Sequence, residues 1–304
     1  MSEVPSVEAL IVSFNTREAL RDTLTSLLEH PPAAHIAEQR LSVFDNGSSD
    51  GSADMVAHQF PQARLVRSAV NLGFGPANNR LAGTSSADYL LLLNSDVIVT
   101  EEIITPLMGV LREDPRLIAV GPRLVHPDGQ VQYSAHRLPT LSYEFAQAVR
   151  GRRLGRAIAP LFDSQQRVDA VHELTLTDER ADPRTPEFLW ATCWLIRRSD
   201  VIAHGLFDEA FTMYDEDLDF CHRALRRGRT FRYVPSAEII HLGGVSSKTG
   251  AEKRRLMTQA RRRYYRRHHG PLNAALYARA IPAVDTLAWL IEAIPRPRRR
   301  RRAR

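Results

Sequence analysis

Residues 89–99, with the sequence YLLLLNSDVIV, decide which kind of fold this chain can adopt. Four consecutive leucines at 90–93 leave no polar face, which is typical of a strand buried on both sides in a parallel sheet covered by helices. The apolar run then stops at Asn94, Ser95 and Asp96. Ligands of open α/β sheets bind beyond the carboxyl ends of the strands, so Asp96 stands where a carboxylate can hold a divalent cation and, through it, a pyrophosphate. Capping of the next turn is the alternative interpretation.

The composition is that of an ordinary globular protein. The chain has 304 residues, 43% hydrophobic and 25% charged, which suits one large α/β domain or two smaller ones. Its two cysteines, Cys193 and Cys221, form neither a disulfide framework nor a zinc pattern, as expected in a reducing compartment. Acids stand at the N-terminus where a signal peptide has bases, and no apolar run is long enough to span a bilayer. These features predict a cytoplasmic protein.

The net charge of +6 conceals two oppositely charged regions. From residue 251 onward, 16 Lys and Arg accompany 3 Asp and Glu, whereas the first 250 residues hold 25 basic and 32 acidic ones. A mildly acidic body therefore precedes a strongly basic tail. Such a tail either meets an anionic partner or is simply solvated.

Strands and helices are expected to alternate over the first 120 residues. Apolar runs predict strands at 7–13, 41–44, 63–66 and 117–120, with helices between them. Asn15, directly after the first run, is expected to cap the helix that follows.

Two polar loops follow predicted strands. Residues 45–52 (DNGSSDGS) come directly after the second strand, which suggests a ligand-facing loop, with plain turn chemistry as the alternative. Residues 71–79 bring two glycines before a short helix. Glycine allows close backbone approach, and helix N-terminal amides favour anions, so this loop is by itself a weak indication of a phosphate site.

The order is harder to predict in the second half of the body. Residues 135–186 show no periodicity, and we interpret them as a mobile segment that could form a flap. Residues 188–196 (FLWATCWLI) predict one aromatic-rich strand. Three acids at 215–217 begin a helix that stops at Gly228, and their attraction to the helix dipole is the alternative to a functional role. His241 ends an apolar run, where a structural histidine is the ordinary interpretation.

The C-terminal region predicts two helices and a disordered end. Residues 251–269 indicate a basic helix, and residues 272–294 a second one with an apolar side that includes Leu276 and Leu287. From Pro295 onward the sequence PRPRRRRRAR cannot form a core, so we expect it to be disordered.

The alternation of strands and helices predicts the α/β class. No G-x-G-x-x-G follows the first strand and no G-x-x-x-x-G-K-[ST] occurs, which argues against Rossmann dehydrogenases and P-loop proteins. Six loops remain, in the order VSFN at 12–15, DNGSSDGS at 45–52, NLGF at 71–74, LNSD at 93–96, DEDLD at 215–219 and HLGG at 241–244. Over about residues 7–250 this series closely resembles the family 2 glycosyltransferases of GT-A fold, most nearly their rhamnosyltransferase and galactofuranosyltransferase branches.

The resemblance implies a GT-A nucleotide-sugar-binding fold, with a mostly parallel sheet flanked by helices, and an enzyme that inverts the anomeric carbon. Asp217 matches the catalytic base of the family's Glu-Asp motif, with Glu216 beside it. Asp96 matches the second Asp of an Asp-x-Asp metal motif, and His241 matches a histidine that supplies a further ligand to Mg²⁺ or Mn²⁺. The nucleotide-sugar is expected to contact Ser13, Asn15, Asp45, Asn71, Gly73, Asn78 and Asp96, and the acceptor to contact Trp190 and Asp215.

The chemistry agrees with these roles. Direct displacement needs one carboxylate to accept the proton of the acceptor hydroxyl and a cation to neutralise the departing nucleoside diphosphate. A glycosidase would need a second carboxylate across the scissile bond. Asn94 replaces the first Asp of the metal motif, so modest metal affinity is expected. Residues 190–193 (WATC) stand where many relatives carry Ser-Gly-Ala, which leaves the acceptor contacts open.

These roles imply definite partners. We predict a catalytic domain at residues 1–250 that takes a dTDP- or UDP-sugar, dTDP-rhamnose being one candidate, and a cell-surface glycan or polyprenyl-linked acceptor. The basic helical extension and Arg-rich tail, residues 251–304, are expected to contact the anionic inner face of the cell membrane without spanning it. One alternative is a nucleotidyltransferase of similar sheet architecture, although residues 13–16 (SFNT) lack the Gly-rich basic loop expected there. The other is nucleic-acid binding through the tail, which the acidic body argues against.

Overall fold

The computed structural model of the chain describes residues 5–31, 38–149, 186–243 and 250–293. Most of the segment interpreted as a flap, residues 150–185, and the Arg-rich tail from residue 294 lie outside the described residues. The chain forms two compact units, one of residues 1–138 and 174–261 and the other of residues 139–173 and 262–304. The predicted domain division at residue 250 stays a prediction.

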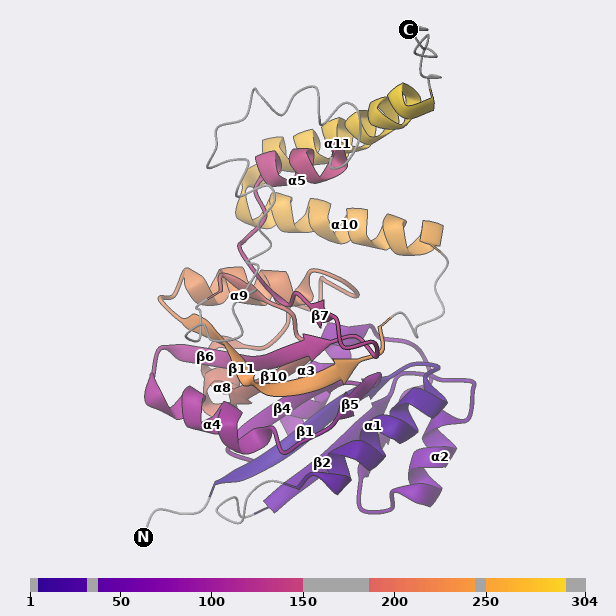
Figure 1. The fold of residues 1–304 in the computed structure, drawn as a ribbon, viewed down its shortest axis with the longest axis vertical. Helices are drawn as coiled ribbons and strands as arrows, with labels where there is room; N and C mark the ends of the chain where they lie inside the picture. The colour runs from indigo at the N-terminus through magenta and orange to yellow at the C-terminus, as the bar shows by residue number, and fades with distance from the viewer. Residues whose placement is uncertain (1–4, 32–37, 150–185, 244–249, 294–304) are drawn as a thin grey trace, which may run out of the picture. The chain divides into compact units, whose positions relative to one another are not determined.

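Among the described residues, nine strands of the first unit form one mixed sheet (Figure 1). They are β1 Ser6–Ser13, β2 Glu38–Asp45, β3 Arg64–Arg67, β4 Tyr89–Asn94, β5 Val97–Val99, β6 Leu117–Val125, β7 Val131–Gln132, β10 Cys193–Arg197 and β11 Thr230–His241. Their order is β3-β2-β1-β4-β10-β6-β11-β5, with β7 paired to β6. The first four strands of this order are parallel, whereas β10 is antiparallel to both neighbours. β11 is parallel to β6 and antiparallel to β5.

Helices cover both faces of this sheet (Figure 1). Leu91 and Leu93 pack in one core cluster with α1 Arg17–Glu29, α2 Ser52–Gln59 and α4 Ile104–Glu113. Leu90 and Leu92 pack in the other with α3 Phe74–Thr84, α8 Arg198–His204 and α9 Glu216–Leu225. All four leucines are at most 1% exposed, and burying each side chain contributes roughly 2 kcal/mol. The prediction of an α/β fold around a strand buried on both sides is confirmed.

Two expectations about the middle of the chain are wrong. Residues 188–196 do not form one strand, because β9 Phe188–Leu189 pairs with β8 Ala135–His136 in a separate two-stranded sheet and β10 begins only at Cys193. The segment from residue 135 is also partly ordered, since it contains β8 and α5 Leu141–Val149. The turn between β9 and β10 contains neither Gly nor Pro, so the sequence carried no break signal there.

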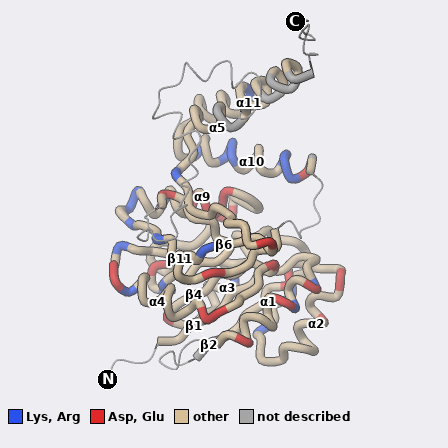
Figure 2. Tube along the Cα trace, in the orientation of Figure 1, with Lys and Arg blue, Asp and Glu red and all other residues tan. Residues whose placement is uncertain are grey.

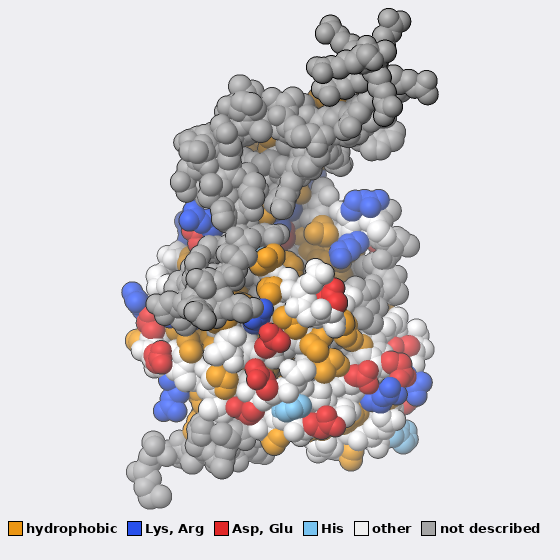
Figure 3. Space-filling view, in the orientation of Figure 1, with side chains coloured by type: hydrophobic (Ala, Val, Ile, Leu, Met, Phe, Trp, Pro, Cys, Tyr) orange, Lys and Arg blue, Asp and Glu red, His pale blue; other side chains and the backbone are white. Residues whose placement is uncertain are grey.

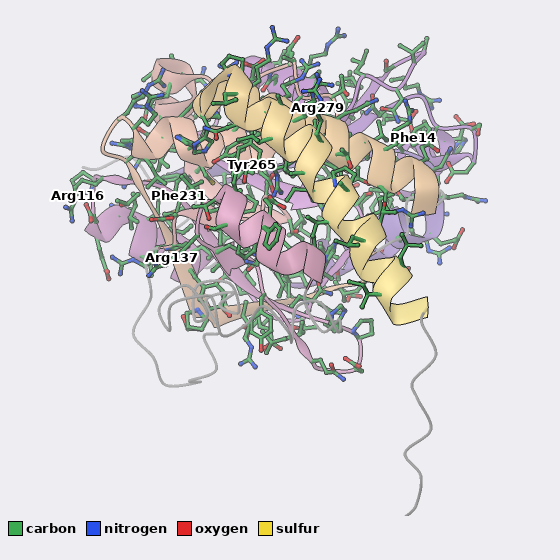
Figure 4. All side chains as sticks on the ribbon, turned by 90° about the horizontal axis from the view of Figure 1, so that it is seen from above. Phe14, Arg116, Arg137, Phe231, Tyr265 and Arg279 are labelled. Carbon is green, nitrogen blue, oxygen red and sulfur yellow. The ribbon has the colours of Figure 1, made fainter. Side chains whose placement is uncertain are left out.

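Helices make up the described part of the second unit. α5 packs against α11 Gly270–Ala293, and α10 Gly250–His268 contributes its residues from 262 onward. Tyr265, labelled in Figure 4, stacks on Tyr277 with ring centroids 5.2 Å apart. Its hydroxyl donates to the Pro139 carbonyl. No helix in the described part of the chain is long and apolar enough to cross a bilayer.

The distribution of charge agrees with the two regions expected from the sequence. Basic positions recur along α10 (Figure 2), whereas acidic and hydrophobic side chains are interspersed on the face of the first unit that Figure 3 shows. Anionic ligands of the first unit therefore depend on local groups rather than on its overall charge.

Candidate active site

The parallel strands end at one edge of the sheet, where several of the predicted site residues lie. Ser13 pairs in register with Asp45, and Val12 pairs with Asn94. A cavity of about 160 Å³ opens at this edge, and its lining includes Phe14, Asn46, Asn71, Phe74, Asp96 and Met213. Segments far apart in the sequence thus surround one space, as expected for the carboxyl ends of strands in an α/β sheet.

Of the residues predicted to contact the nucleotide-sugar, Asn71 and Asp96 line the cavity, whereas Ser13, Asn15, Asp45, Gly73 and Asn78 do not. The buried Ser13 Oγ lies 2.9 Å from Thr16 Oγ1, which donates to Ser95 Oγ at 3.0 Å. Thr16 and Ser95 do line the cavity, so Ser13 stiffens its wall. Asn78 is 1% exposed and donates through Nδ2 to the Phe74 carbonyl within α3. The predicted contacts of Ser13 and Asn78 with a nucleotide-sugar stay predictions.

Asn15 ties two loops together instead of capping a helix. The residue before α1 is Thr16, and Asn15 has a left-handed backbone with φ of 52°. Its Oδ1 accepts the N–H of Ser49 at 2.8 Å, and its own N–H donates to Ser48 Oγ at 3.0 Å. The predicted helix cap is therefore wrong, because the side chain is used to hold the loop after β2 against the end of β1.

The loop after β2 carries a buried carboxylate with an unpaired oxygen. Asp45 is 4% exposed, and its Oδ2 accepts the N–H of Ser48 at 3.2 Å. Its Oδ1 is buried and has no hydrogen-bond partner among the described residues. Leaving such an oxygen unpaired costs about 1–3 kcal/mol unless a ligand supplies a donor. A ring N–H of a nucleobase is one donor of the right kind.

Asn71 and Gly73 belong to a loop that Asn46 organises. Asn46 Nδ2 donates to Asn71 Oδ1 and to the Gly73 carbonyl, both at 3.1 Å, and its Oδ1 accepts the N–H of Leu72. Gly73 has φ of 95°, and a Cβ at this position would overlap the backbone carbonyl of Thr212. Because Thr212 leads into the acidic run at the start of α9, glycine is required where these two loops meet.

Asp96 and His241 lie far apart in the sequence and meet at this edge. His241 Nε2 is 3.4 Å from Asp96 Oδ1, and the N–H of Leu242 donates to the Asp96 carbonyl at 2.9 Å. β11 brings them together, since its His241 pairs with Val97 of β5. The described residues contain no group of three or more His, Cys, Asp and Glu that could hold a metal. A cation here would therefore take two ligands of these types, in line with the modest affinity expected from Asn94.

Gln132 on β7 determines which nitrogen of His241 faces Asp96. Its Nε2 lies 2.7 Å from the His241 carbonyl oxygen, which can only accept, so this end of the side chain is the NH₂ group. Its Oε1 lies 2.8 Å from His241 Nδ1, so Nδ1 carries the hydrogen. A neutral His241 then turns the Nε2 lone pair toward the Asp96 carboxylate. Two acceptors that face each other suit a bound cation, so these residues fit Mg²⁺ or Mn²⁺.

Asp217 lies in the first turn of α9, with its carboxylate held by backbone N–H groups. Oδ2 accepts the N–H of Ala191 at 3.3 Å, and Oδ1 accepts that of Leu218 at 2.8 Å. Burial raises the pKa of Asp217 to about 6, the charge of Asp215 also raises it, and these two amides lower it. A carboxylate with this pKa is ionised at neutral pH and is a stronger base than an ordinary aspartate.

A short turn, residues 190–192, connects Asp217 to the end of β4. The Ala191 N–H holds the Asp217 carboxylate, and the Thr192 carbonyl accepts the N–H of Asn94 at 2.9 Å. Asn94 stands two residues before Asp96. The candidate base and the end of β4, two residues before Asp96, are therefore held by the same turn.

The two acids before Asp217 have different surroundings. Glu216 is 7% exposed, and its Oε2 is buried with no hydrogen-bond partner within the described ranges. Burial, with the charge of Asp217 in second place, raises the pKa of Glu216 well above its usual range and favours the protonated form. Asp215 has φ of 59° and forms a two-point ion pair with Arg261 of α10, at 2.8 Å from Nε to Oδ2.

Trp190 presents an aromatic surface next to the segment that holds Asp217. Its side chain is 36% exposed, and its ring centroid lies 5.3 Å from that of His136. His136 in turn lies 5.8 Å from Phe188, so three rings form one cluster. Because Ala191 follows Trp190 and contacts Asp217, an apolar sugar face placed on this ring would lie close to the carboxylate.

Comparison with known proteins identifies the family. The family model described as Glycosyl transferase family 2 matches residues 9–205, which is more than half of the chain. The chain belongs to glycosyl transferase family 2. The fold and family expected from the six loops are therefore confirmed.

A curated relative of this family 2 chain is the N-acetylglucosaminyl-diphospho-decaprenol L-rhamnosyltransferase of Mycobacterium tuberculosis. The two are 33% identical over 210 residues, which cover 65% of this chain and 64% of the relative. The chain thus spans less than two-thirds of the length of that relative.

Solved structures show the same fold at low sequence identity. GalNAc-T7 with UDP, GalNAc and Mn²⁺ has a TM-score of 0.59 and 14% identity, over 97% of this chain and 57% of that one. The mannosyltransferase PcManGT from Pyrobaculum calidifontis, in complex with GDP-Man and Mn²⁺, has the same TM-score and identity, over 97% of this chain and 78% of that one. At such identities the likeness shows the GT-A fold and nothing finer.

Sequence reasoning missed two residues that organise this site. Gln132 lies in a hairpin strand that resembles no motif, and only its pairing next to β6 brings it to His241. Arg261 lies among many arginines of a basic helix, so nothing in the sequence distinguished it from its neighbours.

Proposed function

We propose that this family 2 chain is an inverting glycosyltransferase that moves a sugar, with L-rhamnose as the first candidate, from a nucleoside-diphosphate sugar to a hydroxyl of a lipid-linked glycan. The observation that carries the proposal is the turn at residues 190–192, which holds both the Asp217 carboxylate and the end of β4. A base and a diphosphate site fixed to one turn meet the positional demands of a single displacement.

The donor is proposed to bind at the strand ends. Asp45 Oδ1 accepts a ring N–H of the base, and the loops of Asn15 and Asn71 enclose the nucleoside. Uracil and thymine both offer such an N–H, so Asp45 suits UDP- and dTDP-sugars alike. Asp96 and His241 would hold Mg²⁺ or Mn²⁺, which when bound neutralises charge on the departing nucleoside diphosphate.

Asp217 is proposed to act as the general base. Its carboxylate takes the proton of the acceptor hydroxyl while that oxygen attacks the anomeric carbon, and the bond from this carbon to the diphosphate oxygen breaks. Attack opposite the leaving group inverts the configuration. The pKa of about 6 supports this role, because Asp217 is then ionised near neutrality and still basic. Glu216 assists as a neutral neighbour, since its protonated form adds no charge beside the base.

The acceptor side rests on the rings near Asp217 and on the relative. That relative's name describes transfer of L-rhamnose to N-acetylglucosaminyl-diphospho-decaprenol. We infer that a sugar of a similar acceptor stacks on Trp190 and turns a hydroxyl toward Asp217. Asp215, whose ion pair with Arg261 fixes the backbone before the base, is proposed to border this acceptor.

The test is a transfer assay with defined partners. The full chain is incubated with Mn²⁺, an N-acetylglucosaminyl diphosphate on a short prenyl chain, and a panel of dTDP- and UDP-sugars, and products are weighed by mass spectrometry. We expect transfer from dTDP-rhamnose by the wild type and by Asp22→Asn, which alters an exposed aspartate of α1, but not by Asp217→Asn. Transfer of another sugar would replace rhamnose in the proposal. No transfer, together with no donor that raises the melting temperature, would overturn it.

A further inference from the structure

The second unit carries four exposed leucines along one side of α11. Leu272, Leu276, Leu287 and Leu290 are 71%, 46%, 49% and 51% exposed. Successive residues of an α-helix are rotated by about 100°, so these four positions fall within about 60° of one another. Their line spans about 27 Å of helix. We call these four side chains the leucine stripe.

The leucine stripe is not the side on which α11 folds. α11 packs against α5, and its Ala274 and Tyr277 are buried. Tyr277 is also the side chain that stacks on Tyr265. The helix therefore has a buried side that stabilises the second unit and a separate apolar side in contact with water. Large apolar side chains gathered on one exposed side of a helix, here in two pairs, mark an interaction surface more often than isolated ones do.

Exposed arginine side chains lie on the same helix as the leucine stripe and elsewhere in the same unit. Arg279 is exposed and lies within about 20° of the line through Leu272 and Leu290. It is labelled on α11 in Figure 4. Arg262 and Arg266 of α10 are exposed in the same unit. Residues 262–304 hold 12 Lys and Arg against 2 Asp and Glu. The second unit thus combines an exposed apolar surface with an excess of positive charge, which favours an anionic partner.

We propose that α11 lies in the plane of an anionic lipid bilayer, with the leucine stripe among the acyl chains and Arg279 reaching the headgroups. An arginine within an apolar row suits this depth, because its stem can lie along acyl chains while its guanidinium meets phosphate. A second copy of the chain is the less suitable occupant, since each copy would bring the same excess of arginine and the two would repel. The proposal adds a surface to the proposed function but does not rest on it.

Vesicle sedimentation of the full chain tests the proposal. It needs neither donor nor acceptor, so its outcome is independent of the outcome of the transfer assay. Vesicles of phosphatidylcholine alone are compared with vesicles containing three-tenths phosphatidylglycerol. The variant is Leu276→Gln with Leu287→Gln, since Gln keeps helix propensity. The matched control is Ile202→Gln, which removes a 68% exposed apolar side chain from α8. Melting temperatures and the mass in solution are measured for each protein.

We expect binding only to anionic vesicles, a loss of about tenfold or more in the double variant, and wild-type binding by Ile202→Gln. Arg279→Gln is expected to lose about fivefold, with a weaker response to salt. If the double variant unfolds, the Arg279→Gln variant tests the proposal instead, through its expected loss of about fivefold in binding to anionic vesicles. Wild-type binding by a folded double variant would overturn the proposal, and so would equal binding to neutral vesicles. A wild-type dimer that the double variant converts to a monomer would assign the stripe to a second copy instead.

Discussion

The donor edge, formed by the ends of β1, β2 and β4, and the base segment, residues 212–219, keep their polar groups in place in different ways. At the donor edge, neutral hydroxyl and amide hydrogen bonds such as Ser13 to Thr16 hold the loops. At the base segment, three adjacent acids share one short stretch, and two consecutive non-glycine residues, Tyr214 and Asp215, adopt positive φ, at 67° and 59°. At the donor edge, Asn15 is the one described non-glycine residue that does so, at 52°. Left-handed backbone at non-glycine residues costs about 1–3 kcal/mol each and persists only when surrounding contacts impose it.

Donor binding and proton transfer are thus assigned to different regions of the fold. The donor edge leaves single acceptors, Asp45 Oδ1 and His241 Nε2, ready for a ligand without rearrangement. At the base segment, burial and then the charge of Asp215 raise the pKa of Asp217 and make it a stronger base. Positive φ at Tyr214 and Asp215 adds backbone strain to the same segment. The two regions touch through the turn at residues 190–192 and through Gly73 at Thr212. Substitutions can therefore alter the donor edge alone, the base segment alone, or the contact between them.

The largest expected effect is on the base segment alone. Asp217→Asn should lower kcat by a factor of about 10²–10⁴, because the acceptor hydroxyl loses its proton acceptor. The melting temperature should stay close to that of the wild type, since the amide oxygen can still accept from Ala191 and the variant no longer holds a charge at position 217. Turnover of Asp22→Asn under the same conditions serves as the control. Near-normal turnover by Asp217→Asn would make Glu216 or Asp215 the next candidate.

The next effect should follow from breaking the connection. Gly73→Ala should destabilise the protein by about 2–3 kcal/mol and weaken donor binding, because positive φ and the Thr212 carbonyl leave no room for a Cβ. Chemical denaturation and donor-induced thermal shift measure the two consequences. Gly83→Ala, inside the helix α3 that begins directly after Gly73, is the matched control. A Cβ there meets nothing within 4 Å, so this substitution should leave stability unchanged or raised. Equal stabilities of the two variants would contradict this account.

A smaller effect is expected at the donor edge alone. Gln132→Leu should weaken Mn²⁺ binding by about 10- to 100-fold, because His241 then loses the acceptor that fixes its tautomer. Binding is measured by electron paramagnetic resonance of Mn²⁺, without donor or turnover. Gln130→Leu, on the exposed part of the same hairpin, is the control. Unchanged Mn²⁺ affinity in Gln132→Leu would show that the tautomer is set by other contacts.

The smallest effect concerns pH. The raised pKa of Asp217 predicts that kcat/KM is constant above pH 7 and falls as the pH drops through about 6, where this base becomes protonated. Asp215→Asn removes a like charge and leaves the cation of Arg261, and both changes favour the ionised base. The acid limb should therefore move to lower pH, by less than about one unit. A shift to higher pH would contradict the assigned cause.

Much of the fold could be predicted because its signals are local. The four leucines at 90–93 predict a strand buried on both sides. The polar loops that follow the predicted strands indicate the edge of the sheet at which a ligand binds. The division of residues 188–196 into β9 and β10 could not be predicted, because Ala191 and Thr192 carry no turn signal and are held by Asp217 and Asn94 instead. Tertiary contacts, and not local preference, end the strand there.

The candidate site shows the same limit. Asp96 and His241 could be predicted as a pair from motif order, and the structure brings them within 3.4 Å. Asn15 was expected to cap a helix from its residue type, yet Ser48 and Ser49 engage it across loops. Gln132 contacts His241 only because β7 folds back on β6. A residue that orients another side chain across strands cannot be predicted from the sequence until the pairing of those strands is known.

The most direct test of the division between donor edge and base segment measures donor affinity and turnover on the same samples. Asp217→Asn and Asp96→Asn are titrated with dTDP-rhamnose, with and without Mn²⁺, by calorimetry, and then assayed for transfer. The account predicts that Asp217→Asn binds the donor as the wild type does but does not transfer the sugar. Asp96→Asn should bind more weakly than the wild type only when Mn²⁺ is present. Equal loss of donor binding in both variants, or transfer by Asp217→Asn at the wild-type rate, would contradict it.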